Sequence, residues 1–481
     1  MSLPSPLKRA SAPAVGAGET PVDGAAYQEW AAYDDRVAVL KRQYAAIPPG
    51  AAVRLAKKTS NLFRTRAATD QPGLDVKAFD GVIAVDPVAR TADVQGMTTY
   101  EHLVDATLPY GLMPLVVPQL KTITLGGAVT GLGIESSSFR NGCPHESVLE
   151  MDVLTGAGEV VTARPDNEHS DLFFGFPNSY GSLGYALRLK IELQPVEPHV
   201  RLRHLRFASV GAAVPVLEQV CRERSWEGEP VDFVDGAVFG PDEVYLVLAD
   251  WATEAPYTSD YTLEHVYYRS LQQRSEDYLT VRDYLWRWDT DWFWCSRVFG
   301  VQTRPRLRKL LGHRYLRSDT WWKLVNLEKK YGFKAKLDAR KGLPPREDVV
   351  QDIEVPIERL EEFCTDFLRE VPIEPFWLCP LQQRDPDRQW PLYRLDPAQL
   401  YVNVGFWSTV PQRPGDPDWH NVWVEQEVER LGGRKSLYST AFYDEPTFWR
   451  LYGGDAYTGL KKRYDPDARL ADLYAKTVGR R

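Results

Sequence analysis

The sequence predicts an α+β protein with two main domains, and three observations support this prediction. Its 481 residues exceed what one ordinary hydrophobic core organises, because a domain usually holds about 100–200 residues. Short β-rich and helical stretches are mixed up to about residue 196. After Pro195 and Pro198 the chain becomes richer in aromatic residues and its segments lengthen, so we expect a second domain from residue 199.

The first domain is predicted to span residues 25–198 and to follow a disordered tail. Residues 1–24 consist mainly of Ala, Pro, Gly and Ser, which offer little to bury. From Ala25 to about Ala46, apolar residues recur at helical spacing until two prolines and a glycine stop the run. Further elements are bounded by Gly, Pro or Asp. We expect strands at 51–55, 81–86, 91–96, 150–163 (two runs) and 185–196, and a helix at 98–111.

The second domain is predicted to span residues 199–481 as an α+β cap or substrate domain. Residues 236–251 are typical of strands, whereas residues 260–279 are interpreted as a helix. No internal repeat is present at any solenoid period.

Composition excludes several functional classes. The net charge of -8 argues against nucleic acid as a partner. Five cysteines at wide spacing, without a CxxC pair, predict neither a disulfide framework nor a metal site. No run of about 18 apolar residues is present, and the N-terminal residues lack an apolar signal core. We therefore expect a cytoplasmic protein.

The segment TLGGAVTGLGIESSSFRNG, residues 124–142, carries the strongest functional signal. Its glycines let backbone N–H groups approach a phosphate or a ring without Cβ obstruction, and successive N–H groups in turns form an anion-binding nest. It is neither a GxGxxG fingerprint nor a P-loop, because two prolines precede it and no P-loop lysine follows. A bound anionic cofactor is the natural interpretation.

The neighbouring segments give this loop a context. AKKTSNLFRTR at 56–66 lies upstream, and SDLFFGFPNSYGSLGYALRLKIEL at 170–193 lies downstream. This order resembles the two-part PCMH-type FAD-binding domain of the vanillyl-alcohol-oxidase group. The resemblance implies that FAD would be held by Lys58, Thr59, Ser60, Asn61, Leu62, Gln119, Thr124, Gly126, Gly127, Thr130, Gly131, Gly133, Ile134 and Ser136, with Gly184 and Ile191 near the adenine.

Several later motifs resemble the Delta24-sterol reductase family more specifically. They are GIESSS at 133–138, FVDGAVFGPDEV, EPFWLCP, LYVNVGFW and LYSTAFYDEPTFW, and the resemblance runs from about Val53 to the end. It implies a flavin reductase whose C-terminal segment packs near the flavin. Eukaryotic members begin with a membrane-anchoring segment that is absent here, and no His or Cys for covalent attachment is evident in the first loop. We therefore expect non-covalent FAD, with NADPH or NADH as electron donor.

Reducing an isolated double bond requires a proton donor, because no carbonyl polarises the alkene. The donor must reach within about 3 Å of the less substituted carbon, and hydride then adds to the tertiary centre. Glu135 is the first candidate, because burial would raise the pKa of its carboxyl, although a loop-stabilising role is equally open. Tyr443 and His145 are further candidates, and Asn403 is a candidate flavin contact; each also has a purely structural interpretation.

Residues 278–336 combine tryptophans with arginines and lysines. Indole rings favour the membrane–water boundary and basic side chains favour anionic head groups, so this region is a candidate peripheral contact with the inner face of a membrane. The alternative is that most of its aromatic residues belong to the core or to a substrate tunnel. Either interpretation suits an apolar substrate.

The predicted function is reduction of an isolated C=C bond in a lipid. Abundant Arg and Ala are typical of a high-GC bacterial coding sequence, and most such bacteria make no sterols, which favours a methylene-branched fatty acyl chain reduced to the methyl-branched (10-methyl) form. A partner lipid methyltransferase would then install the extra carbon. The alternatives are a Delta24-sterol reductase, a flavin-dependent alcohol oxidase or dehydrogenase, and a non-catalytic lipid-binding protein.

Overall fold

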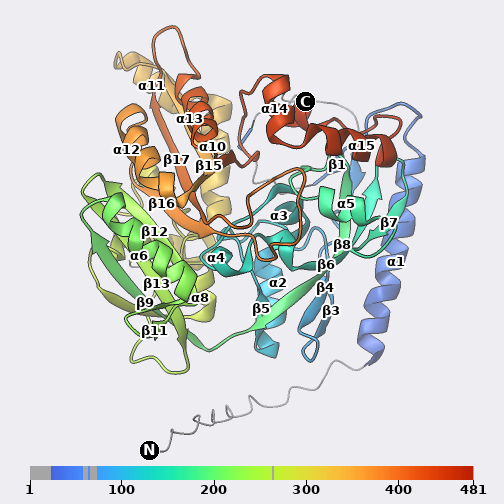
Figure 1. Ribbon diagram of the computed structural model, residues 1–481, viewed down its shortest axis with the longest axis horizontal. Coiled ribbons are helices and arrows are strands. Elements are labelled where there is room, and N and C mark those ends of the chain that lie inside the picture. Colours follow the sequence, from blue (N-terminus) through green and yellow to red (C-terminus); the bar gives the residue numbers. More distant parts are fainter. Residues whose placement is uncertain (1–22, 58–62, 65–72, 263–264, 480–481) are drawn as a thin grey trace, which may run out of the picture.

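The computed structural model describes residues 23–57, 63–64, 73–262 and 265–479. Within them, helices and strands build two large sheets, as Figure 1 shows, and two further sheets of two strands each, which confirms the predicted α+β class. The chain leaves the first sheet at Pro195 and enters the second at His199.

The first sheet has the order β3-β4-β8-β6-β7, with β5 also paired to β8. Its long central strand β8 (Gly184–Pro195) is antiparallel to β4 and β6, and Leu189 and Ile191 on it are fully buried. The long helix α1 (Asp23–Ala45) lies along one side of this unit (Figure 1). The other elements are β1 (Leu55–Ala56), β2 (Leu74–Asp75), β3 (Val82–Asp86), β4 (Thr91–Gln95), α2 (Tyr100–Thr107), β5 (Leu112–Pro114), α3 (Leu125–Gly131), α4 (Ser138–Asn141), β6 (Val148–Thr155), β7 (Val160–Ala163) and α5 (Ser170–Gly175).

A buried charge cluster fixes α1 against the first sheet. Tyr33 donates a 2.8 Å hydrogen bond to the carboxylate of Asp152 on β6. Arg188 on β8 donates to the same carboxylate at 2.7 Å and to Asp93 on β4 at 2.6 Å. Charge-assisted hydrogen bonds of this kind are strong when they are withdrawn from water. The cluster therefore joins α1 and three strands.

The second sheet is antiparallel and has the order β14-β9-β13-β12-β16-β17-β15-β18. Helices α6 (Val210–Glu223), α12 (Leu360–Glu370) and α13 (Trp419–Arg430) cover one face and form a separate hydrophobic core with it (Figure 1). The strands are β9 (His199–Phe207), β12 (Phe233–Gly240), β13 (Glu243–Ala252), β14 (Glu276–Thr280), β15 (Arg346–Pro356), β16 (Phe376–Leu381), β17 (Tyr401–Pro411) and β18 (Arg434–Lys435), and β10 (Ser225–Trp226) pairs with β11 (Glu229–Pro230) outside the sheet.

The C-terminal helices return to the first unit. Figure 1 shows α14 (Glu445–Leu451) and α15 (Gly454–Tyr464) beside α5 and β1. Arg463 on α15 pairs with Asp171 on α5 at 2.9 Å. Lys476 on α16 (Leu473–Thr477) donates a 2.6 Å hydrogen bond to the carbonyl of Gly181. The end of the chain thus closes over the domain that begins it.

Two sequence-based predictions of local structure were wrong. In the described part of residues 260–279, the only helix or strand elements are the short helix α7 (Tyr267–Ser270) and the edge strand β14. Tyr261 and Tyr267 are buried in the core, and β14 pairs with β9, so tertiary packing and strand pairing prevail over local helix periodicity. The strand expected at 51–55 is reduced to the two residues of β1.

Candidate active site

A cavity of about 650 Å³ lies between the two sheets, a size typical of a small-molecule site. The first unit and the second sheet both contribute to its wall, so the site depends on how they pack. From the first unit the wall includes Gly96, Gln119, Thr124, Gly126, Gly127, Thr130, Gly131, Gly133, Ile134 and Gly184. From later in the chain it includes Trp292, Phe293, Asp352, Trp377, Asn403, Trp407, Ser436, Tyr438 and Lys476.

The glycine-rich segment forms part of this wall, but largely as a short helix and not as the predicted nest of turns. Helix α3 is capped by Thr124, whose hydroxyl accepts a hydrogen bond from the Gly127 amide at 3.2 Å. A Cβ added at Gly126 would lie 2.7 Å from the carbonyl oxygen of Gly96. The glycine is therefore required for close approach of two backbones. That approach brings α3 to the cavity.

Two residues predicted to hold the cofactor, Ser136 and Ile191, are not part of the described cavity wall. Residues 58–62 lie outside the described part of the chain. Ser136 is buried, and its hydroxyl donates to Glu135 at 2.7 Å instead of facing the cavity. Ile191 is fully buried within β8, between its partners Ala92 and Val148. The remaining predicted cofactor contacts all belong to the cavity wall.

Glu135 occupies a buried ion-pair network and not the wall. Arg287 donates a 3.0 Å hydrogen bond to Glu135 and a 2.8 Å hydrogen bond to Asp235 on β12, and Gln119 also donates to Glu135. Burial raises the pKa of the Glu135 carboxyl, while the nearby Arg287 opposes that shift. Among the described residues Glu135 is not part of the cavity lining. The geometry gives it the role of a link between the two units, so we do not retain it as the proton donor.

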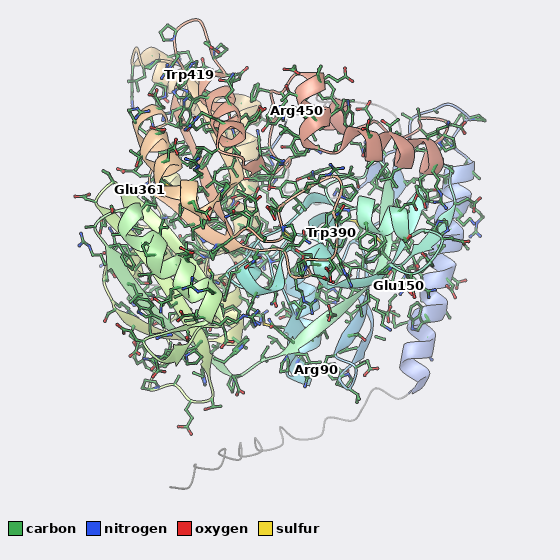
Figure 2. The ribbon with its side chains drawn as sticks, viewed as in Figure 1. Arg90, Glu150, Glu361, Trp390, Trp419 and Arg450 are labelled. Carbon is green, nitrogen blue, oxygen red and sulfur yellow. The ribbon has the colours of Figure 1, made fainter. Side chains whose placement is uncertain are left out.

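His145 and Tyr443 are also away from the cavity lining, as far as the described residues define it. Burial lowers the pKa of His145 to about 3, so its ring is neutral near pH 7. Its ring meets Trp390 edge-on at 4.4 Å between centroids, and Figure 2 shows Trp390 in the middle of the molecule. Tyr443 is buried against Tyr452, with ring centroids 6.0 Å apart. Packing explains both residues.

A different acidic group lies in the cavity wall. Asp352 on β15 accepts a 3.1 Å hydrogen bond from the amide nitrogen of Asn403 on β17 and is hydrogen-bonded to the hydroxyl of Tyr438. The indole N–H of Trp407 donates to that hydroxyl at 3.0 Å. Burial raises the pKa of Asp352 from 3.8 to about 6, because the charged carboxylate loses solvation by water. The wall thus holds a carboxyl that titrates near neutral pH.

The period-two alternation of the strands explains this cluster. Val349, Ile353 and Val355 on β15 face the helix-covered core, so Asp352 points to the opposite face. On β17, Val402 and Val404 likewise enter that core, which turns Asn403 toward the cavity. Asp352 lies opposite Gly405 and Glu354 opposite Asn403 in the β15–β17 pair, so the polar side chains meet across neighbouring strands.

Aromatic rings surround this acidic group. Phe293 and Trp407 lie 4.2 Å apart between ring centroids, and Trp377 lies 5.6 Å from Phe293. Phe63 stacks on Trp292 at 5.7 Å. This wall favours an apolar ligand, because it excludes water and offers large ring surfaces for contact. Sequence reasoning placed Trp292 and Phe293 only in the Trp-rich region 278–336, and it quoted Trp377 and Trp407 only as parts of motifs. The spatial arrangement assigns all four to the cavity wall.

The described residues fit a flavin nucleotide. The glycine backbones of α3 and its neighbours offer close approach to an anionic group, and Lys476 adds a positive charge to the wall. The side-chain oxygen of Asn403 is buried and has no hydrogen-bond partner within the described chain. A buried acceptor of this kind needs a donor, and an N–H of the isoalloxazine ring can supply one.

Comparison with known proteins defines the class of this chain. Residues 42–164 match the FAD binding domain family. Together with the fold and the cavity, this match identifies an FAD-dependent oxidoreductase. In the part of the chain that the structure describes, no helix has both the length and the apolar character needed to cross a membrane.

The relatives that match most of the chain are more specific. The chain is 25% identical over 417 residues to Delta(24)-sterol reductase of Rattus norvegicus, which covers 84% of this chain and 75% of the relative. It is 23% identical over 438 residues to Delta(24)-sterol reductase of Arabidopsis thaliana, covering 84% and 76%. Cytokinin dehydrogenase 7 of Oryza sativa subsp. japonica is 34% identical over 150 residues, 31% of this chain and 28% of that one. The resemblance to Delta24-sterol reductases predicted from the sequence motifs is confirmed.

Proposed function

We propose that this protein reduces an isolated C=C bond in a lipid, with FAD as non-covalent cofactor and NADPH or NADH as electron source. The observation that carries the proposal is the cavity wall, in which a titratable carboxyl, Asp352, lies among the rings of Trp377 and Trp407. An apolar alkene needs both a dry pocket and a proton donor. The named activity of the relatives, sterol reduction, supports the same reaction class.

Asp352 is the proton donor in this proposal. In its protonated form the carboxyl gives its proton to the less substituted alkene carbon, which leaves tertiary carbocation character on the other carbon. FAD, when bound in its reduced form in this cavity, would supply the hydride that completes saturation. Tyr438 and Asn403 hold the carboxyl in place through their hydrogen bonds. A pKa of about 6 keeps an appreciable protonated fraction just below neutrality, which is the range useful for a general acid.

The substrate that we propose is a methylene-branched fatty acyl chain, reduced to the methyl-branched form. Protonation of its terminal methylene carbon leaves the charge on a tertiary carbon, as the chemistry requires. A lipid methyltransferase reaction must then precede this step, because it supplies the one-carbon branch. The composition of the chain, with abundant Arg and Ala, supports a bacterial setting without sterols.

A Delta24-sterol substrate is the second candidate, because relatives that match most of the chain carry that name. A sterol side-chain alkene also yields a tertiary centre on protonation. The same cavity and the same donor would serve both lipids.

The test is the visible absorption spectrum of the purified protein, recorded without oxygen before and after adding NADPH and then lipid. We expect a flavin band that bleaches with NADPH and returns only with a methylene-branched phospholipid. Recovery with a Delta24-sterol alone would replace the acyl proposal with the sterol one. Oxygen consumption driven by alcohols would instead support an oxidase or dehydrogenase. A colourless protein that takes up no added FAD would refute the enzyme assignment and favour a lipid-binding protein.

A further inference from the structure

The segment 298–343 concentrates most of the exposed apolar side chains of the described chain. It comprises α9 (Pro305–Tyr315), α10 (Ser318–Tyr331) and α11 (Phe333–Arg340), with the residues just before and after them. Twelve large apolar side chains are exposed among the described residues, and eight of them lie here, which is far more than chance placement over the surface would give. They are Val298, Leu310, Tyr315, Leu324, Leu327, Tyr331, Leu337 and Leu343.

On α10 these side chains form one stripe. Leu324, Leu327 and Tyr331 are spaced three and four residues apart, so they lie on the same face of the helix. Trp321 is buried, and Trp322 and Val325 on another face of the helix pack against the core. Helix α10 is therefore apolar on two faces, and only one of them is covered by the described protein. Exposed apolar surface of this kind marks an interaction site.

The same segment is strongly basic in an acidic protein. Residues 304–341 contain thirteen Lys and Arg against three Asp and Glu, a net charge of +10, whereas the whole chain carries -8. Exposed basic residues accompany the apolar ones; they include Arg304, Arg306, Lys309, Arg314, Lys323, Lys336, Arg340 and Lys341. Apolar side chains bordered by cations match an anionic bilayer surface, which offers acyl chains beneath negatively charged head groups.

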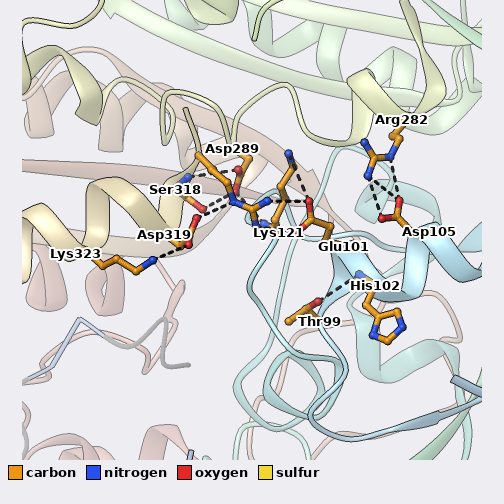
Figure 3. Close-up of polar contacts among 11 residues, drawn as sticks. Thr99, Glu101, His102, Asp105, Lys121, Arg282, Asp289, Ser318, Asp319 and Lys323 are labelled. Carbon is orange, nitrogen blue, oxygen red and sulfur yellow. Dashed lines mark hydrogen bonds and ion pairs between the residues drawn. The ribbon is translucent and has the colours of Figure 1, made fainter. Parts of the chain in front are cut away.

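The segment is firmly attached and adjoins the cavity. Arg317 binds the carboxylate of Glu101 on α2 at 2.8 and 3.1 Å. Ser318, at the start of α10, contacts Asp289, as Figure 3 shows. On the inner side, the ring of Trp322 lies 4.8 Å from Phe63 and 5.9 Å from Trp292, both of which line the cavity. Helix α10 thus connects the exposed apolar stripe with the cavity wall.

We propose that the surface of α9, α10 and α11 docks the protein onto a membrane containing anionic lipids, beside the cavity. The proposed membrane contact is narrower than the region 278–336 considered from the sequence. The side chains of Trp286, Trp288, Trp292 and Trp294 are buried, so they are not part of the docking surface. The inference goes beyond the proposed reaction. It concerns where the protein meets its lipid and not what happens to the double bond.

The experiment is vesicle co-sedimentation of the FAD-loaded full chain. Vesicles of phosphatidylcholine alone are compared with vesicles that also contain phosphatidylglycerol, at low and high salt. We expect binding to the anionic vesicles that weakens as salt is added. The paired substitution Leu310→Asp with Leu327→Asp should weaken it by about tenfold or more, because two apolar contacts become like charges facing an anionic surface. Reversing the charges of Lys336 and Arg340 to Glu should cost about fivefold or more for each residue.

Val88→Asp is the matched control, because Val88 is 93% exposed in the turn between β3 and β4, outside this surface. It introduces one negative charge, against two in the paired variant, and should leave vesicle binding unchanged. Absence of binding to anionic vesicles, or equal loss with Val88→Asp, would overturn the proposal. A change from dimer to monomer in the Leu310 and Leu327 variant would also overturn it, because the surface would then bind a second copy of the chain. A preference of the protein for duplex DNA over vesicles would overturn it as well. Lipid reduction in detergent micelles should be unaffected by these variants, so failure of docking is separable from failure of the reaction.

Discussion

Replacement of Asp352 by Asn gives the sharpest test of the site. The substitution keeps the size of the side chain but removes its ability to ionise. Because the folded-state pKa is about 6 and the usual value is 3.8, the folded protein holds this proton more tightly than the unfolded chain does. The carboxyl therefore favours the folded state fully below about pH 4, and that advantage is lost as pH rises to about 6.

The size of the effect follows from the pKa difference. One pKa unit corresponds to about 1.36 kcal/mol, so ionisation of Asp352 destabilises the folded protein by up to about 3 kcal/mol at pH 7 relative to pH 4. The amide that replaces the carboxyl cannot ionise. The free energy of unfolding of Asp352→Asn, compared with wild type, should therefore improve by up to about 3 kcal/mol between pH 4 and pH 7. Urea denaturation at the two pH values measures this change.

The rate of lipid reduction should fall in Asp352→Asn, although its stability relative to wild type should rise between pH 4 and pH 7. With a protonated Asp352 as donor, wild-type lipid reduction falls as pH rises through about 6. Asp352→Asn should lower kcat about 100-fold or more and remove that pH dependence. Glu354→Gln is the matched control, because Glu354 is a buried carboxyl two residues along the same strand, with its pKa raised to about 8, but it is absent from the cavity lining as described. It should retain activity. A variant at 352 with wild-type turnover, or with a stability difference that does not depend on pH, would refute this assignment.

Three further outcomes are expected. Tyr438→Phe should lower kcat about tenfold and shift the pH profile upward, because Asp352 loses a hydrogen bond that stabilises its charged form; an unchanged profile would contradict the role of Tyr438. Gly126→Ala should reduce flavin content and Tm, because the added Cβ would lie 2.7 Å from a backbone carbonyl oxygen. Gly459→Ala is the control, because Gly459 has open space around it, and it should change neither quantity. Equal behaviour of the two variants would argue against the backbone contact. Arg287→Met should destabilise the fold by about 3–5 kcal/mol, because the buried carboxylates of Glu135 and Asp235 lose their cationic partner. Urea denaturation measures this loss, and a clearly smaller value would argue against the ion-pair link.

The sequence by itself determined the α+β class, most element positions in the first domain and the class of cofactor. These depend on local signals. Alternating apolar residues predict the long strand β8, and glycines placed among small hydroxylated residues identify a segment that allows close approach of a backbone or ligand. The later motifs added the resemblance to Delta24-sterol reductases, which the comparisons confirm.

Tertiary structure alone decided which polar groups meet. Asp352 and Tyr438 are separated by 86 positions, and they come together only because strand pairing and the return of the chain place both in the wall of one cavity. The local sequence points to Glu135 as the proton donor, yet Arg287 from the second unit forms an ion pair with its carboxylate. The tryptophans at 286–294 could not be placed from the sequence either, because a local sequence does not show which of its side chains other parts of the protein bury. Long-range packing therefore decided which of these rings line the cavity, and it left apolar side chains on α9, α10 and α11 exposed.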